Sequence, residues 1–147
     1  MGKRAEKAVE LFGQGYNCSQ AVFCAFADEF GFDEETAMRI SIGFGGGFGR
    51  LREVCGAFSA CTMLAGLANK SKLEDASEAK KEAYKEVRFL KEEFEKRNGS
   101  FICRDLLGLS GPSESHVPEE RTEHYKKTRP CEEIVRDAAL IMEEYLK

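Results

Sequence analysis

The sequence predicts an all-α protein: a single-domain helical bundle, residues 1–147, of about five to six helices with a long surface loop before the last helix. Three observations lead to this fold class. Apolar residues recur at helical spacing along most of the chain, no segment alternates like a strand, and capping residues or glycines separate the helical stretches. A chain of 147 residues is long enough for one hydrophobic core.

The first three expected helices each have a recognisable start or stop. An amphipathic first helix ends at Gly13, and Asn17 is a favourable N-cap for a second helix from residue 18 to about residue 29. Asp33 can cap a third helix. We expect three of its apolar side chains to face inward: Ala37, Ile40 and Ile42.

Five glycines between residues 43 and 49 interrupt the helical pattern. Each glycine costs about 1 kcal/mol relative to alanine inside a helix, so we predict a loop there. A fourth helix should follow from about residue 51 to residue 69. It is apolar on nearly every side, which indicates a central, buried position.

The second half of the chain is more polar. A fifth helix, from about residue 75 to residue 97, has one narrow apolar seam and should lie on the outside. A short helix carrying Cys103 follows. Residues 110 to about 128 contain Gly and Pro and predict a long surface loop, with a helical turn near Glu119. Pro130 at a first helical position opens the last helix.

Composition narrows the class of partner. The net charge is −4, and Lys and Arg alternate with Glu, so no basic face for nucleic acid is expected. The N-terminus lacks the apolar run of a signal peptide, and no stretch approaches the roughly 20 apolar residues of a membrane span. We expect a cytoplasmic protein that binds neither nucleic acid nor membrane. A homodimer is compatible with the sequence.

The glycine run does not match a nucleotide-binding loop. No Lys-Ser or Lys-Thr follows it, Arg50 occupies the third glycine position of GxGxxG, and no strand precedes it. We therefore expect no nucleotide. Glycines also let backbone N–H groups approach an anionic thiolate or cluster. On this interpretation the residues that contact a cofactor are Gly46, Gly47, Arg50 and Gly56.

The chain has six cysteines, which in a reducing compartment are not expected to form permanent disulfides. No CxxC occurs, so zinc ribbons and thioredoxin-type dithiols lack their local signature. Cys24 and Cys61 lie in the middle of expected helices among apolar residues. We predict that both are core residues, because a buried free cysteine behaves as a small hydrophobe.

The other four cysteines lie at or near expected helix N-termini: Cys18, Cys55, Cys103 and Cys131. The helix dipole and free N–H groups at such positions stabilise a thiolate and lower its pKa. Arginines are close in sequence at positions 50, 52, 104 and 129. This pattern predicts functional thiolates, although simple burial in the core remains an open alternative.

These positions resemble a known family. Cys18, the Cys55-Gly56-Ala57 step after a glycine-rich lead, Cys103 and Cys131 are similar to the redox-active protein family named for its C-GCAxxG-C-C pattern. The resemblance spans nearly the whole chain, with Ala60 in place of the last glycine of the element. It implies a small, largely helical protein of bacterial or archaeal type with a shared four-thiol site, and it implies little about substrate.

Three hypotheses for function follow. In the first, Cys18, Cys55, Cys103 and Cys131 ligate an iron–sulfur cluster or another metal such as zinc. In the second, a metal-free thiol–disulfide redox protein uses Cys55 as the attacking thiol and Cys18 or Cys131 as the resolving one, so that Cys55 and Cys18 are the expected catalytic residues. In the third, the chain is a non-catalytic helical interaction protein. The redox hypotheses imply an unknown redox partner.

Overall fold

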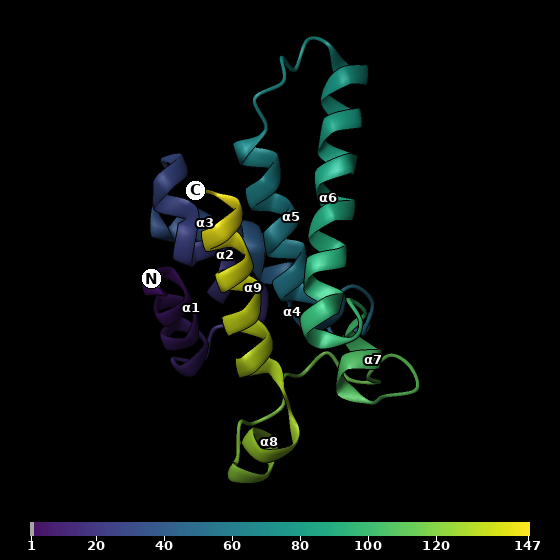
Figure 1. Cartoon of the computed structure of the whole chain (residues 1–147). Coiled ribbons are helices and arrows are strands. Elements are labelled where there is room, and N and C mark those ends of the chain that lie inside the picture. Colours follow the sequence, from purple (N-terminus) through teal and green to yellow (C-terminus); the bar gives the residue numbers. More distant parts are fainter. Residues whose placement is uncertain (1) are drawn as a thin grey trace.

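A computed structural model describes residues 2–147 of the chain. Within this range the chain is built of helices, with a single isolated backbone bridge between Val54 and Ile102 in place of any strand. The longer helices are α1 (Lys3–Gly13), α2 (Cys18–Phe26), α3 (Glu34–Ser41), α5 (Gly56–Ala68), α6 (Ala76–Asn98) and α9 (Cys131–Tyr145). The shorter ones are α4 (Gly45–Phe48), α7 (Cys103–Leu107) and α8 (Glu123–Thr128), as Figure 1 shows. The predicted all-α class is confirmed.

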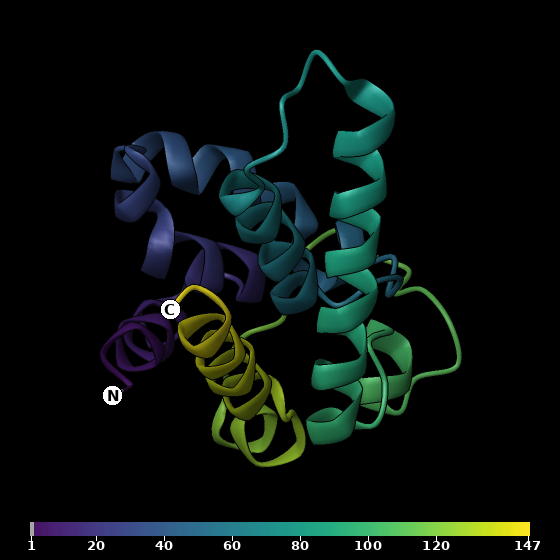
Figure 2. The same ribbon diagram turned by 45° about the horizontal axis from the view of Figure 1, so that its top comes forward.

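The core lies around α2 and α5, which pack against each other and are buried on most of their surface. Small side chains such as Ala21, Ala25, Ala57 and Ala60 are fully buried and let these backbones come close. α9 lies between α1 and α6, as both ribbon views show (Figures 1 and 2). The predicted central helix is therefore α5, and the predicted outer helix is α6.

The start of α2 shows why its boundary was visible in the sequence. The Asn17 side chain accepts a hydrogen bond from the backbone N–H of Gln20 at 3.0 Å, and the Gln20 side chain accepts one from the backbone of Asn17 at 3.1 Å. This reciprocal pair is a capping box. Asn17 also donates to the carbonyl of Ile42 at 2.9 Å, which holds the start of α2 against the segment before α4.

The predicted helix from residue 51 to residue 69 is wrong at its start, because α5 begins only at Gly56. Arg50 and Arg52 have left-handed backbone conformations, with φ of 69° and 61°. The backbone of residues 52–55 bonds instead to a distant part of the chain. Its bonds run from Cys55 N to Phe101 O (2.9 Å), from Cys103 N to Glu53 O (2.6 Å) and from Arg104 N to Arg52 O (3.2 Å).

The glycine segment forms compact turns around α4 and not an open loop. Gly46 and Gly47 both adopt left-handed φ, near 69° and 67°. A Cβ added at Gly47 would lie 2.7 Å from Cβ of Cys103, so only glycine fits there without displacement. The glycines therefore pack this turn directly against the first residue of α7.

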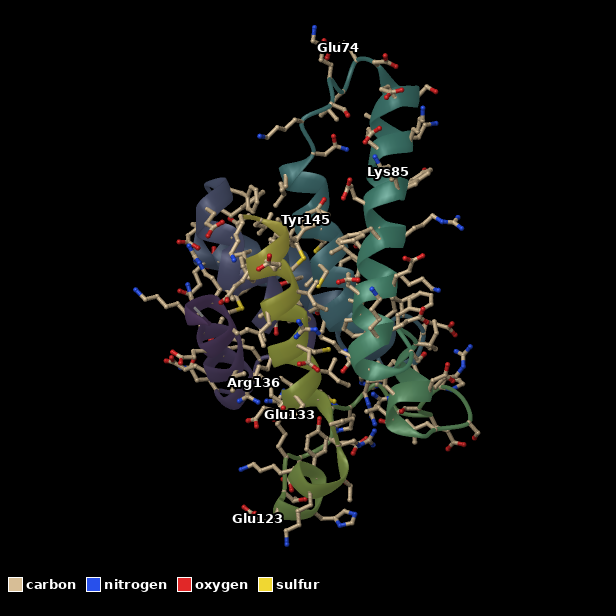
Figure 3. The ribbon with its side chains drawn as sticks, in the orientation of Figure 1. Glu74, Lys85, Glu123, Glu133, Arg136 and Tyr145 are labelled. Carbon is tan, nitrogen blue, oxygen red and sulfur yellow. The ribbon has the colours of Figure 1, made fainter. Side chains whose placement is uncertain are left out.

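The segment before α9 is long, as predicted, but its helix is displaced. The expected turn near Glu119 is found as α8, which begins at Glu123. In Figure 1, α8 projects from the main body below α9. Figure 3 places Glu123 at this end of the molecule and Glu74, in the connection between α5 and α6, at the opposite end.

Two residues of the predicted third helix that were expected in the core are not buried. Ala37 is fully buried, but Ile40 and Ile42 are 43% and 58% exposed. α3 packs mainly on α2 and lies at the edge of the molecule, so one small face is enough to attach it. None of the helices in residues 2–147 is long and apolar enough to cross a membrane.

Candidate functional site

The structure brings the starts of four helices to one place. Cys18, Cys103 and Cys131 are the first residues of α2, α7 and α9, and Cys55 is the N-cap of α5. The predicted location of these cysteines at helix starts is confirmed. Because the elements come from distant parts of the sequence, only the tertiary fold collects the four thiols.

All four cysteines line a single cavity of about 90 Å³. The other polar side chains of its lining are Asn17, Arg52, Arg121 and Tyr125, and the described residues around it include no carboxylate and no imidazole. The six cysteines of the chain are free thiols. The four thiols are thus the strongest potential metal ligands among the side chains of the cavity wall.

Cys24 and Cys61 lie elsewhere in the hydrophobic core, 6% and 1% exposed. Neither lines the cavity. The Cys61 thiol donates to the carbonyl of Ala138 at 3.8 Å. The prediction that these two cysteines are core residues is confirmed.

Burial controls the ionisation of the cavity thiols. It raises the pKa of Cys55 well above its ordinary value, and a negative charge on Cys18 raises it further. Burial also raises the pKa of Cys18, and it raises that of Cys131 to about 11, with added contributions from Cys18 and Cys103. The expected lowering of the thiol pKa at helix starts is wrong for these three, because loss of hydration outweighs the helix dipole.

The nearby backbone opposes the effect of burial on the pKa of two of these thiols. The nearby backbone of Gly46, Ser19 and Ala57 lowers the pKa of Cys18 against the larger effect of burial. The backbone of Phe58 and Ala57 does the same for Cys55. N–H groups at helix starts have no partner within their own helix. The backbone around both sulfurs therefore favours their charged form.

Arg52 brings a cation directly to the thiols. Its side chain is almost entirely buried, and its Nη1 donates to the sulfur of Cys103 at 3.7 Å. Nε donates to the Ser113 hydroxyl at 2.9 Å, which fixes the direction of the guanidinium. The fork geometry of arginine lets one side chain make both contacts.

Two of the predicted cofactor-contacting residues line the cavity. Gly46 and Gly56 are part of its wall. A Cβ at Gly56 would lie 2.7 Å from the sulfur of Cys18 and 2.8 Å from the carbonyl of Phe44, so glycine is what lets Cys18 approach the start of α5.

The other two predicted contact residues lie outside the wall. Gly47 packs behind Cys103. Arg50 belongs to an outer groove, where it donates to the carbonyls of Ser115 and Val117.

Sequence reasoning missed Arg121 and Tyr125, which both line the cavity. The guanidinium of Arg121 lies 3.9 Å from the ring centre of Phe12 and donates to the carbonyls of Phe12 and Tyr16. The Tyr125 hydroxyl lowers the pKa of the Cys131 thiol against the larger effect of burial. No local signal marks either residue. The partners of Arg121 lie more than 100 residues away in the sequence, and the partner of Tyr125 lies in the next helix.

The arrangement permits two kinds of thiol chemistry: ligation of a metal or cluster after loss of protons, and oxidation of a thiol pair. Among residues 2–147, no three His, Cys, Asp or Glu side chains are grouped closely enough to hold a metal ion as they stand.

The comparisons with known proteins agree with the cysteine positions. The family model described as "Putative redox-active protein (C_GCAxxG_C_C)" matches residues 16–145, a range that includes all four cavity cysteines. No curated protein and no solved structure matches the chain. Because the match covers most of the sequence, the chain belongs to the C_GCAxxG_C_C family.

Proposed function

We propose that Cys18, Cys55, Cys103 and Cys131 together bind an iron–sulfur cluster, or another thiolate-ligated metal, and that the protein is an electron carrier. One observation carries this proposal: four thiols from four separate helix starts line one cavity. Membership of a redox-active cysteine family supports it.

The donor set and the size of the cavity favour a cluster. Soft thiolate ligands without oxygen or nitrogen ligands suit iron–sulfur clusters, zinc and Cu(I). The cavity of about 90 Å³ is several times larger than the roughly 10–15 Å³ that one water molecule needs. A single zinc ion requires four sulfurs at about 2.3 Å, whereas a cluster can span sulfurs that lie further apart.

The surroundings fit a negatively charged group. Arg52 and Arg121 line the cavity, and the backbone near Cys18 and Cys55 favours the charged form of both thiols. Such cations and hydrogen bonds stabilise anionic sulfur and raise the reduction potential. When bound, a cluster would supply reversible one-electron transfer. Burial keeps water away from Cys55 and Cys103, and a separate redox partner would deliver or accept the electron.

The test is anaerobic purification followed by analysis of iron, acid-labile sulfide and visible absorbance. We expect iron and sulfide in the wild-type chain and in Cys24→Ala, whose cysteine is in the core outside the cavity. Cys55→Ser should lose most of both. Wild-type protein that stays colourless and free of iron, zinc and sulfide after anaerobic reconstitution would contradict the proposal.

A second candidate is thiol–disulfide exchange between Cys18 and Cys55. The observation that favours it is their proximity: Gly56 lets the Cys18 sulfur approach α5, and Cys18 is the charge that most raises the pKa of Cys55 after burial. Two thiols would give two electrons and two protons to an oxidised partner as the S–S bond forms. Treatment of the metal-free chain with oxidised glutathione should then remove two of its six free thiols. The Cys18→Ser variant should lose none. If all six thiols remain in the wild type, this candidate function is excluded.

A further inference from the structure

A second, larger hollow opens beside the cysteine cavity. This groove has a volume of about 990 Å³ and shares five polar or thiol side chains with the cavity: Asn17, Arg52, Arg121, Tyr125 and Cys131. The two hollows are therefore neighbours with a common wall. A molecule in the groove would lie next to Cys131.

The groove is strongly basic although the whole chain has a net charge of −4. Five Arg or Lys side chains line it against two Glu: Arg50, Arg52, Arg121, Lys126 and Arg129 against Glu119 and Glu132. Clefts lined by one sign of charge concentrate ligands of the other sign. The groove is thus the place on this acidic protein that attracts anions.

One carboxylate forms ion pairs with three of these guanidiniums. Oε1 of Glu119 lies 2.8 Å from Nη2 of Arg129, 3.1 Å from Nη2 of Arg50 and 3.5 Å from Nη2 of Arg52. A single negative charge cannot neutralise three positive ones. Arg121 adds a further cation whose hydrogen bonds go to backbone carbonyls, which carry no net charge.

Arg129 also has a donor without a partner. Its Nη1 is buried and makes no hydrogen bond with the described residues, while its Nη2 binds Glu119. A buried charged donor without an acceptor is costly, so native structures almost always supply one. Arg129 lines the groove but not the cysteine cavity, so an acceptor for its guanidinium belongs on the groove side.

We propose that the groove binds the oxyanion group, carboxylate or phosphate, of a small organic molecule, with the guanidinium of Arg129 among its donors. Arginine forks recognise both of these groups. The volume of the groove lies within the roughly 300–1,000 Å³ of small-molecule sites, and Phe12, Ile42 and Leu107 provide apolar wall for the rest of the ligand. This proposal rests on the groove alone and holds whether or not the cysteines bind a cluster.

The experiment is calorimetric titration of the full chain with inorganic phosphate, and separately with succinate, at constant ionic strength. We expect saturable binding of at least one of the two, and which one binds identifies the oxyanion. Arg129→Met should weaken that binding at least about tenfold, the loss expected for a hydrogen bond to a charged group. Arg88→Met, a control on the exposed side of α6, should bind like the wild type.

Each failure of this experiment has a definite meaning. Absence of saturable binding of both anions to the wild type overturns the proposal, and so does unchanged affinity in Arg129→Met. If circular dichroism shows that Arg129→Met does not fold, the variant Lys126→Met, at an exposed position of the groove, replaces it. Lys126→Met should weaken anion binding severalfold. Unchanged affinity in that variant overturns the proposal.

A repeat titration after removal of iron separates this site from the cysteine site. Unchanged affinity in the iron-free chain supports a groove that acts independently of the cavity. Affinity that disappears with the iron would assign the anion to the cysteine cavity and overturn the groove as a site. The iron analysis of the wild-type chain reports on the proposed function without reference to either anion.

Discussion

Gly56 lies between two of the cavity cysteines, next to Cys55 in the sequence and against Cys18 in space. Its missing side chain leaves the room that the sulfur of Cys18 occupies. The sequence predicted that this glycine allows a close approach to a thiolate or cluster. The structure identifies the approaching group, which is a thiol from another helix.

We predict that Gly56→Ala destabilises the chain by about 1–3 kcal/mol, the usual cost of overpacking, and reduces the iron bound per chain because Cys18 must move. Gly66 in the same helix is the matched control, since a Cβ there meets nothing within 4 Å. Gly66→Ala should stabilise the chain by about 0.5–1 kcal/mol. Urea unfolding measures both, and equal stability of the two variants would show that the contact with Cys18 is unimportant.

Left-handed backbone at non-glycine residues is concentrated beside the cavity. Phe48, Arg50 and Arg52 have φ of 67°, 69° and 61°. Such conformations cost roughly 1–2 kcal/mol each and persist where surrounding contacts hold them. At Arg52 those contacts are visible, because its backbone bonds to Gly46 and to Arg104 and its side chain to Cys103 and Ser113.

At the scale of elements, helix starts were the most predictable feature. Asn17 and Asp33 cap α2 and α3 as expected, because capping depends on residues within one turn. The start of α5 was not predictable in the same way. Its preceding residues bond to residues 101–104, and no local pattern reveals a partner about 50 positions away.

α9 is attached to α6 through a titratable contact near its C-terminal end, where Figure 3 labels Tyr145. The Tyr145 hydroxyl donates to the carboxylate of Glu86 at 2.9 Å. Burial raises the pKa of Tyr145 to about 12, and the hydrogen bond and charge of Glu86 add to the shift. The folded chain therefore keeps this proton at a pH where the unfolded chain releases it.

This contact predicts a specific pH dependence. The stabilisation from Tyr145 is complete below its ordinary pKa of 10 and is lost as the pH rises from there toward about 12. Tyr145→Phe should be less stable than the wild type by about 0.5–1 kcal/mol near neutrality, since the pair is only half-buried. Urea unfolding across this pH range should show the difference shrinking at high pH. The exposed Tyr84→Phe is the control, and a constant difference would contradict the prediction.

At the scale of the whole molecule, a cluster of aromatic rings joins α5, α6 and the segment before α7. The ring of Phe58 lies 5.5 Å from those of both Phe94 and Phe101, measured between centroids. Phe94 is 1% exposed, whereas Phe89 on the same helix is 48% exposed. The cluster holds the long helix α6 against the end of the bundle that carries the cysteines.

We predict that Phe94→Ala destabilises the chain by about 3–5 kcal/mol, because it removes a fully buried ring and leaves a cavity. Phe89→Ala, the matched control with a half-exposed ring, should cost less than about 1.5 kcal/mol. Chemical denaturation compares the two. A small effect of Phe94→Ala would show that α6 contributes little to the core.

The sequence alone determined the helical class, the capped helix starts and the set of four cysteines, because these follow from local spacing and residue type. It did not determine that the four thiols line one cavity, or that Arg121 and Tyr125 complete the wall. It also led to the wrong direction for the thiol pKa, since helix starts are visible in a sequence and loss of hydration is not. Those properties arise from contacts between distant segments, and only the tertiary structure decided them.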